Sequence, residues 1–154
     1  MKIRKTILKK YMMMLAVGAL LLCLVSTALA AKRVDRRFVD SANHTGYYLD
    51  VNSIEYDGGD ALSVDVYIVK PQFNAMYMYA TNYNMKEKSY QFVHTKIYQY
   101  DTRKVTGESK VPSPKTGYSD LSAGNNKEME KVLEFALEWH RTHLYKTNGG
   151  ELLD

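Results

Sequence analysis

The chain has 154 residues, with 21 Lys or Arg, 17 Asp or Glu and a formal net charge of +4 at pH 7. Five of the basic residues and none of the acidic ones lie in residues 1–30, so the rest of the chain has 16 basic and 17 acidic residues and a formal charge of −1. A near-neutral domain gives no support for nucleic acid as a partner, because that function requires a concentration of positive charge.

The first 30 residues have the pattern of a cleavable export signal. A cationic start precedes an uncharged apolar run, which ends in small residues at Ala28 and Ala30, as a signal peptidase requires. We expect cleavage after Ala30. The alternative is a retained N-terminal anchor, since about 20 apolar residues can span a bilayer. Leu22 before Cys23 argues against a lipoprotein. The protein is therefore expected in the periplasm, at the cell surface or outside the cell.

Residues 31–146 are expected to form a single exported domain, followed by a flexible tail at 147–154. The one cysteine of the chain, Cys23, lies inside the predicted signal. The domain therefore has no thiol for a disulfide, a nucleophile or a metal site. Its stability must come from an ordinary hydrophobic core, and at this size a chain buries roughly two-thirds of its unfolded surface.

The first half of the domain has the alternating pattern of antiparallel strands. Short apolar segments at 38–39 and 47–49 are expected to be strands joined by a loop at 41–46. Polar turns are expected at 50–53 and at 57–60, where short side chains can bond nearby backbone groups. These segments predict a hairpin followed by two loops.

Three longer strands are expected at 62–68, 75–85 and 90–100. Their aliphatic residues are assigned to one core-facing surface, which comprises Leu62, Val64, Val66, Ile68, Met76, Met78, Ala80, Val93 and Ile97. If the strands form one sheet without a β-bulge, the tyrosines gather on the opposite surface. This predicted phenolic face comprises Tyr67, Tyr77, Tyr79, Tyr98 and Tyr100.

A helix is expected near the C-terminal end of the domain. A loop at 101–107, a short strand at 109–111 and a long connection at 112–125 precede it. Asn125 has the features of a helix N-cap, with Glu128 three residues later, and apolar residues then recur at helical spacing to about His143. The predicted fold class is α+β, an antiparallel sheet closed on one face by a single C-terminal amphipathic helix.

The sequence contains few signs of catalysis. His140 and His143 share one edge of the predicted helix, but the glutamate that a zinc hydrolase motif places between its histidines is missing. A nucleophile elbow, a phosphate-binding glycine loop and a dinucleotide fingerprint are also missing from the sequence. We therefore expect a non-catalytic protein without a cofactor. The alternative is a small envelope hydrolase or metal-binding protein that uses His140 and His143.

The predicted phenolic face is the feature most open to function. Tyrosine favours binding surfaces, because its rigid ring loses little entropy and its hydroxyl can pair with polar groups. The five tyrosines are therefore the predicted contact residues. Two structural alternatives stay open: the rings can pair across strands, or they can be buried under the 112–125 connection. The exposure of the rings distinguishes these cases.

The segment from Gly46 to Ile54, followed by a Gly-Gly loop and a valine-rich strand, is similar to the opening of bacterial surface-adhesin protein E-like domains. That family consists of small exported proteins, some of which bind host matrix proteins. The resemblance implies a non-catalytic domain at the cell surface, but it transfers no binding residue. The expected partner is a protein or another envelope component, or a second copy in a homodimer. Contact with a membrane is expected only through an uncleaved N-terminal segment.

Overall fold

The computed structural model describes residues 33–147. The predicted signal at 1–30 and the predicted tail beyond Thr147 lie outside the described residues. Of the described residues, those from Val34 to Thr147 lie in one compact unit. Within the described range, no helix combines the length and the apolar character that crossing a membrane requires.

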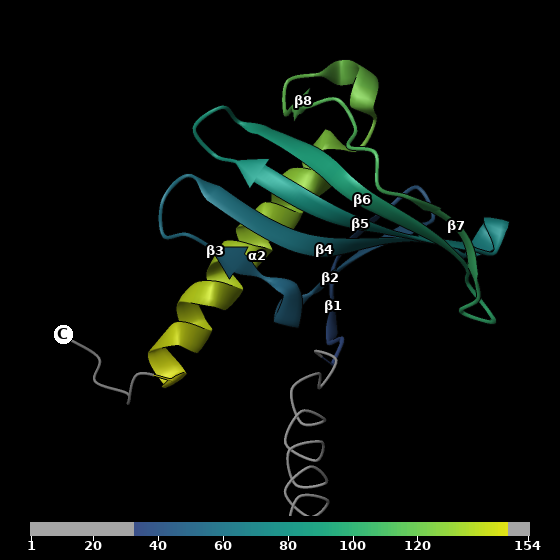
Figure 1. Ribbon diagram of the computed structural model, residues 1–154, viewed down its shortest axis with the longest axis horizontal. Coiled ribbons are helices and arrows are strands. Elements are labelled where there is room, and N and C mark those ends of the chain that lie inside the picture. Colours follow the sequence, from purple (N-terminus) through teal and green to yellow (C-terminus); the bar gives the residue numbers. More distant parts are fainter. Residues whose placement is uncertain (1–32, 148–154) are drawn as a thin grey trace, which may run out of the picture. The chain divides into compact units, whose positions relative to one another are not determined.

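The structure confirms the predicted α+β fold, an antiparallel sheet with one long C-terminal helix (Figure 1). The strands are β1 (Arg36–Ala42), β2 (Thr45–Asp50), β3 (Glu55–Tyr56), β4 (Ala61–Lys70), β5 (Ala75–Asn84), β6 (Ser89–Gln99), β7 (Val105–Ser109) and β8 (Thr116–Gly117). The sheet order is β1-β2-β4-β5-β6-β7, with β3 paired to β4 and β8 paired to β6. Helix α2 (Asn126–Thr147) crosses one face of this sheet (Figure 1).

The hairpin between β1 and β2 is tighter than predicted. The expected loop at 41–46 is wrong, because pairing continues to Ala42 opposite Thr45 and leaves only Asn43 and His44 in the turn. Both of these residues have positive φ, 49° and 60°. A two-residue turn of this handedness matches the twist of the flanking strands, and asparagine tolerates it better than most residues. The polar turns at 50–53 and 57–60 are confirmed as breaks between strands.

Strand β7 lies earlier in the chain than predicted. It occupies Val105–Ser109, whereas the sequence pattern indicates a strand at 109–111. Its position is set by pairing with β6, in which Val105 lies opposite Tyr98 and Ser109 opposite Thr95. The local sequence has no clear alternation there, so this strand depends on its neighbour rather than on its own pattern.

Helix α2 begins where its sequence signals indicate. The carbonyl of Asn125 accepts a hydrogen bond from the Met129 N–H at 3.0 Å, as expected for the residue before the first turn. The helix continues to Thr147, beyond the predicted end at His143. Its buried residues are Met129, Val132, Leu133 and Ala136. They join one core with buried residues of the sheet and of the 3₁₀ turn Val51–Ser53, namely Tyr47, Leu49, Val51, Leu62, Val64, Val66, Ile68, Tyr83 and Tyr90.

The prediction of a single phenolic face is wrong. Tyr77 pairs with Ile68 and Tyr79 pairs with Val66, so both tyrosines lie on the helix-facing side of the sheet with the aliphatic core. Tyr67 pairs with Met78 on the opposite side. The prediction that the aliphatic residues face the helix is correct for β4 and wrong for the methionines of β5. The physical reason is register, since a shift of one residue between two strands reverses the face of every side chain.

A β-bulge in β6 also separates residues that simple alternation groups together. Ala80 pairs with His94, whereas the next residue, Thr81, pairs with Phe92, so Val93 is the extra residue. Phe92 consequently packs with the helix-facing core, while Tyr98 packs on the opposite side. Bulges insert one residue and reverse the side-chain alternation beyond them. The assumption of a bulge-free sheet was therefore wrong.

Candidate functional site

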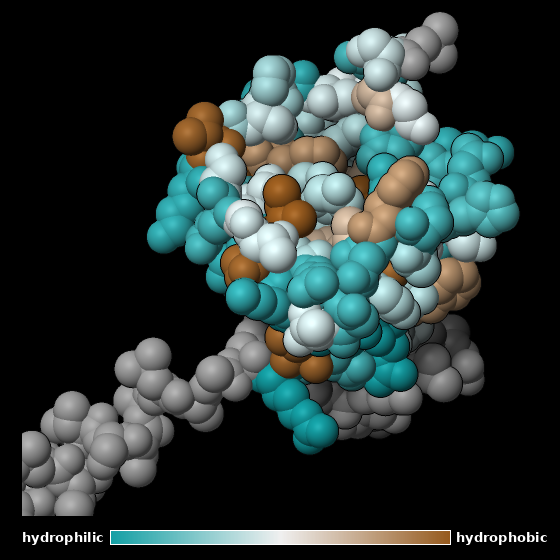
Figure 2. Space-filling model, turned by 90° about the vertical axis from the view of Figure 1, so that its right-hand side faces the viewer, coloured by the Kyte–Doolittle hydropathy of each residue, from teal (hydrophilic) through white to brown (hydrophobic). Residues whose placement is uncertain are grey.

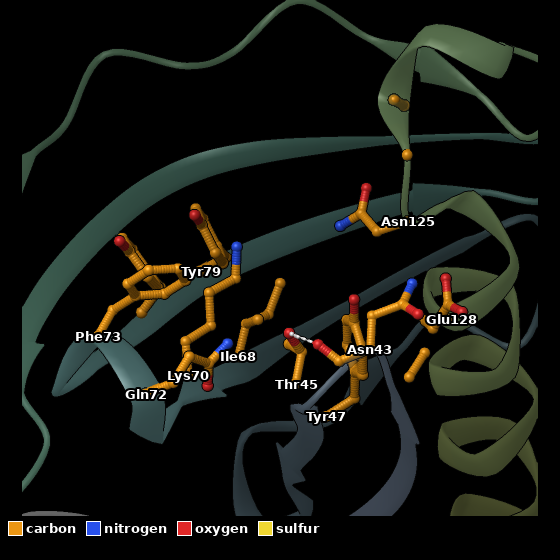
Figure 3. Close-up of a pocket in the computed structure, with 14 residues that line it drawn as sticks. Asn43, Thr45, Tyr47, Ile68, Lys70, Gln72, Phe73, Tyr79, Asn125 and Glu128 are labelled. Carbon is orange, nitrogen blue, oxygen red and sulfur yellow. Dashed lines mark hydrogen bonds between the residues drawn. The ribbon is translucent and has the colours of Figure 1, made fainter.

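A cavity of about 650 Å³ opens on the helix-facing side of the sheet, beside the N-terminal end of α2 (Figure 3). Three parts of the chain surround it: the β1–β2 hairpin, the β4–β5 hairpin and the segment that leads into the helix. We call it the tyrosine pocket. It is lined by Ala42, Asn43, Thr45, Tyr47, Ile68, Lys70, Gln72, Phe73, Tyr77, Tyr79, Ala123, Gly124, Asn125 and Glu128.

Two parallel tyrosine rings form one wall of the tyrosine pocket. Tyr77 and Tyr79 project from the same face of β5, with ring centroids 6.1 Å apart and ring planes 9° apart. Tyr79 also stacks on Phe92 at 4.2 Å, and Phe92 lies 5.4 Å from the buried ring of Tyr90. This chain of ring contacts connects the wall to the core and holds the rings in a defined orientation.

The hydroxyl of Tyr79 remains protonated well above neutral pH. Burial raises its pKa, and the neighbouring Tyr77 adds a smaller contribution in the same direction. Burial likewise raises the pKa of Tyr47, with smaller contributions from the carboxylates of Glu128 and Asp40. Both phenols can therefore donate a hydrogen bond to a ligand at physiological pH.

Polar groups of both charges surround these rings. The Lys70 ammonium lies 5.9 Å from the centroid of the Tyr77 ring, and Glu128 lies on the helix side of the tyrosine pocket (Figure 3). They are the one cation and the one anion among the lining residues. Asn43, Gln72 and Asn125 add amide side chains, which both donate and accept hydrogen bonds. The lining is therefore polar but formally neutral.

Asn125 is positioned by the core beneath it. The Tyr90 hydroxyl donates to Oδ1 of Asn126 at 2.9 Å and lies 3.4 Å from Oδ1 of Asn125. The Asn126 amide in turn donates to the carbonyl oxygens of Gly117 and Tyr118, at 3.1 and 3.2 Å. These bonds hold the segment before α2 against the sheet and place Asn125 at the rim of the tyrosine pocket (Figure 3).

Phe73 supplies a third ring at the opposite rim. It ends the 3₁₀ turn Pro71–Phe73 between β4 and β5, and its exposed fraction is 72%. The following residue, Asn74, has a φ of 47° and turns the chain back into β5. The turn is therefore short and presents the Phe73 ring to solvent on the same side of the cavity as Tyr79 (Figure 3).

The opposite side of the sheet carries a different arrangement, which we call the methionine cluster. It consists of the buried residues Tyr67, Val69, Met76 and Met78, with Tyr48, Tyr98 and Tyr100 packed against them. The Arg36 guanidinium lies 4.1 Å from the Tyr67 ring centroid. The Arg103 guanidinium lies 4.6 Å from the Tyr100 ring centroid, and its Nη1 lies 3.3 Å from the sulfur of Met76. The cluster is thus covered largely by its own rings and cations.

The five tyrosines predicted as contacts therefore divide between two sites. Tyr77 and Tyr79 line the tyrosine pocket. Tyr67 is buried, with an exposed fraction of 4%, while Tyr98 and Tyr100 are half-buried over the methionine cluster. The structure therefore places two of these rings on one face of the sheet and three on the other, rather than all five on one continuous surface.

The two histidines considered as metal ligands each contact an aromatic ring. The His140 ring meets the Tyr56 ring edge to face, with centroids 5.2 Å apart. The His143 ring stacks on Trp139 at 3.8 Å, and its Nδ1 lies 2.9 Å from the Trp139 carbonyl oxygen. Across residues 33–147 the structure contains no group of three His, Cys, Asp or Glu side chains that could hold a metal ion.

Sequence reasoning missed most of the residues around Tyr77 and Tyr79. Lys70 and Phe73 lie between the strands expected at 62–68 and 75–85, and Asn125 and Glu128 lie at the expected helix start. Phe73 carried the one usable signal, because an aromatic residue two positions after Pro71, between two expected strands, has no evident place in the core. No protein-family model, curated protein or solved structure matches this chain. The functional assignment therefore depends on the geometry of the two faces.

Proposed function

We propose that the protein is an exported, non-catalytic binding module and that the tyrosine pocket is its ligand-binding site. The observation that carries this proposal is the pair of parallel, half-buried rings of Tyr77 and Tyr79 in a cavity of about 650 Å³. Ligand sites in proteins have volumes of roughly 300–1,000 Å³ and combine aromatic walls with a few polar groups. The export component rests on the signal pattern of residues 1–30.

The methionine cluster supports a binding role less well. Its central tyrosine, Tyr67, is 4% exposed and has Arg36 stacked over it. A partner would have to displace the guanidinium groups that already cover the rings, and that displacement costs free energy. The tyrosine pocket, in contrast, presents its rings to an open cavity. We therefore assign ligand contact to Tyr77 and Tyr79.

Affinity capture with matched variants tests this assignment. The purified protein serves as bait for envelope and culture-medium fractions, and the double variant Tyr77→Ala/Tyr79→Ala is compared with Tyr98→Ala/Tyr100→Ala. Both variants remove two half-buried phenols, but on opposite sides of the sheet. We expect the first variant to lose the captured component and the second to retain it.

Circular dichroism of each variant provides the control for folding. A milder pair, Tyr77→Phe/Tyr79→Phe, keeps the rings and should keep part of the binding even if the alanine variant unfolds. Equal capture by the wild type and by a folded Tyr77→Ala/Tyr79→Ala variant would contradict the proposal. Loss of capture only in Tyr98→Ala/Tyr100→Ala would show that the ligand binds at the methionine cluster instead.

A further inference from the structure

We propose that the ligand of the tyrosine pocket is a neutral saccharide, bound with the C–H face of a sugar ring against the aromatic wall. This inference rests on the function proposed above and names its ligand class. It follows from three properties of the tyrosine pocket: the parallel aromatic rings of its wall, the neutral hydrogen-bonding lining, and the pairing of β4 and β5 beneath it on both sides.

The aromatic rings at the wall and rim suit a ligand that has C–H groups on one face. The ring planes of Tyr77 and Tyr79 differ by only 9°, and Phe73 stands exposed at the rim. The face of an aromatic ring carries partial negative charge and attracts the partially positive hydrogens of C–H groups. Sugar rings present several such hydrogens together on one face, so they can pack on an aromatic ring without losing contact between their hydroxyls and polar groups.

The polar lining matches hydroxyl groups better than ions. The amides of Asn43, Gln72 and Asn125 can each donate and accept a hydrogen bond, as a sugar hydroxyl does. Lys70 is the one cation of the lining, and Glu128 balances it. An anionic ligand such as a phosphate would meet this carboxylate without a cluster of cations to offset it. The lining therefore favours a neutral, hydroxyl-rich ligand.

Peptides and apolar ligands fit the same surface less well. Strand β4 is paired with β2 and β5, and β5 is paired with β4 and β6, so neither strand beneath the tyrosine pocket offers an unpaired edge for an added peptide strand. Figure 2 faces the end of the molecule at which the β4–β5 turn lies, and its hydrophobic residues form separate patches among hydrophilic ones. An extended apolar ligand would leave such polar groups without partners.

Titration with defined oligosaccharides tests the inference. The probes are the hexasaccharides of β-1,4-glucose, α-1,4-glucose and β-1,4-N-acetylglucosamine, added at millimolar concentration to the purified protein, with a random hexapeptide mixture as the comparison probe. Binding is measured by calorimetry and by backbone amide NMR shifts. We expect at least one hexasaccharide to shift the amides of Asn43, Gln72 and Asn125, and its affinity to be unchanged at high salt, because a neutral ligand has no charge to screen.

The variants give the decisive comparison. Tyr77→Ala/Tyr79→Ala should weaken saccharide binding about tenfold or more, because each ring contact contributes a substantial part of such an affinity. Phe73→Ala should weaken it less, and Tyr100→Ala on the opposite face should leave it unchanged. Phe73 is 72% exposed, so its variant tests the site without disturbing the core.

The outcomes separate the ligand class from the proposed function. Failure of every hexasaccharide to shift these amides overturns the saccharide inference, and so do peptide-induced shifts of the same amides without saccharide shifts. The proposed function still holds in either case if affinity capture depends on Tyr77 and Tyr79. If capture is also independent of those rings, the proposed function itself is wrong.

Discussion

The two faces of this sheet use similar residues for different purposes. Each face has two half-buried tyrosines beside a basic side chain: Tyr77 and Tyr79 with Lys70 on one, Tyr98 and Tyr100 with Arg103 on the other. On the helix-facing side the rings border a cavity, which is also lined by Asn125 and Glu128 at the start of α2. On the other side the rings lie over buried methionines. Composition alone therefore does not identify a binding surface, since the space in front of the rings decides it.

The largest expected effect comes from replacing a fully buried side chain on either face of the sheet, which tests whether each face contributes a hydrophobic core. Leu49 on the helix-facing side is 0% exposed and Met76 in the methionine cluster is 1% exposed. Replacing either residue by alanine should lower the free energy of unfolding by about 2–5 kcal/mol, through lost burial and the cavity that remains. Urea denaturation followed by circular dichroism measures both values. A cost below about 0.5 kcal/mol for Met76→Ala, the range of ordinary surface positions, would show that the methionine cluster is not a core.

A smaller effect is expected from the hydroxyl that connects the sheet to the helix. The Tyr83 hydroxyl donates to the Met129 carbonyl at 3.0 Å within the core. Tyr83→Phe should lower the free energy of unfolding by about 1 kcal/mol, because the buried hydrogen bond is lost while the ring remains. Tyr98→Phe on the opposite face is the matched control and should be close to neutral. Equal costs for the two variants would contradict the special role of the buried hydroxyl.

The next effect concerns the two arginine side chains that cover the methionine cluster, which substitution by alanine removes. Arg36 lies over the Tyr67 ring and Arg103 over the Tyr100 ring. Arg36→Ala/Arg103→Ala should lower the free energy of unfolding by about 1 kcal/mol, because partly exposed cation–π contacts have this magnitude. The same double variant should bind more of a hydrophobic dye, because the rings under the arginines become exposed to solvent. Lys70→Ala at the tyrosine pocket is the control. Unchanged dye fluorescence in the double variant would show that the arginines do not shield the cluster.

The smallest expected effect concerns acid stability. The ion pair of Lys131 on α2 with Asp40 on β1 connects the helix to the sheet edge. The hydrogen bond from Lys131 lowers the pKa of Asp40, and a bond from the Ser41 backbone acts in the same direction. Because the pKa is lower in the folded state, the stabilisation is present above the ordinary aspartate pKa and is lost as the pH falls through the lowered value.

Lys131→Met should therefore reduce stability slightly at neutral pH and have a smaller effect in strong acid, where Asp40 is protonated in both folded and unfolded chains. Thermal unfolding between pH 2 and pH 7 measures this difference. Arg141→Met is the control, because Arg141 pairs with Glu138 on the exposed surface of the helix and makes no connection to the sheet. A penalty for Lys131→Met that grows as the pH falls would contradict the assigned sign.

Much of the fold could be predicted from local patterns. The alternation at 62–68 and the apolar spacing after Asn125 correctly indicated β4 and α2. These signals are local, because a strand or helix that buries one face must repeat its apolar residues with its own period. Strand β7 was misplaced because its hydrogen bonds depend on β6, which lies outside any short window of sequence.

Only the two tyrosines of the candidate site could be anticipated. Tyr77 and Tyr79 were expected to contact a ligand, and the structure places both in the tyrosine pocket. Their neighbours could not be anticipated, because Thr45, Phe73 and Glu128 come from three separate parts of the chain. Only the packing of the β1–β2 hairpin and α2 against the sheet brings these side chains to one cavity.

The sequence by itself determined the three long strands β4, β5 and β6 and the helix α2, because hydrophobic periodicity is a property of neighbouring residues. Only the tertiary structure decided on which face each tyrosine lies. The register of β5 against β4 places Tyr77 opposite Ile68, and the extra residue Val93 reverses the alternation within β6. A change of one residue in either feature would exchange the two faces, since successive side chains of a strand point to opposite sides.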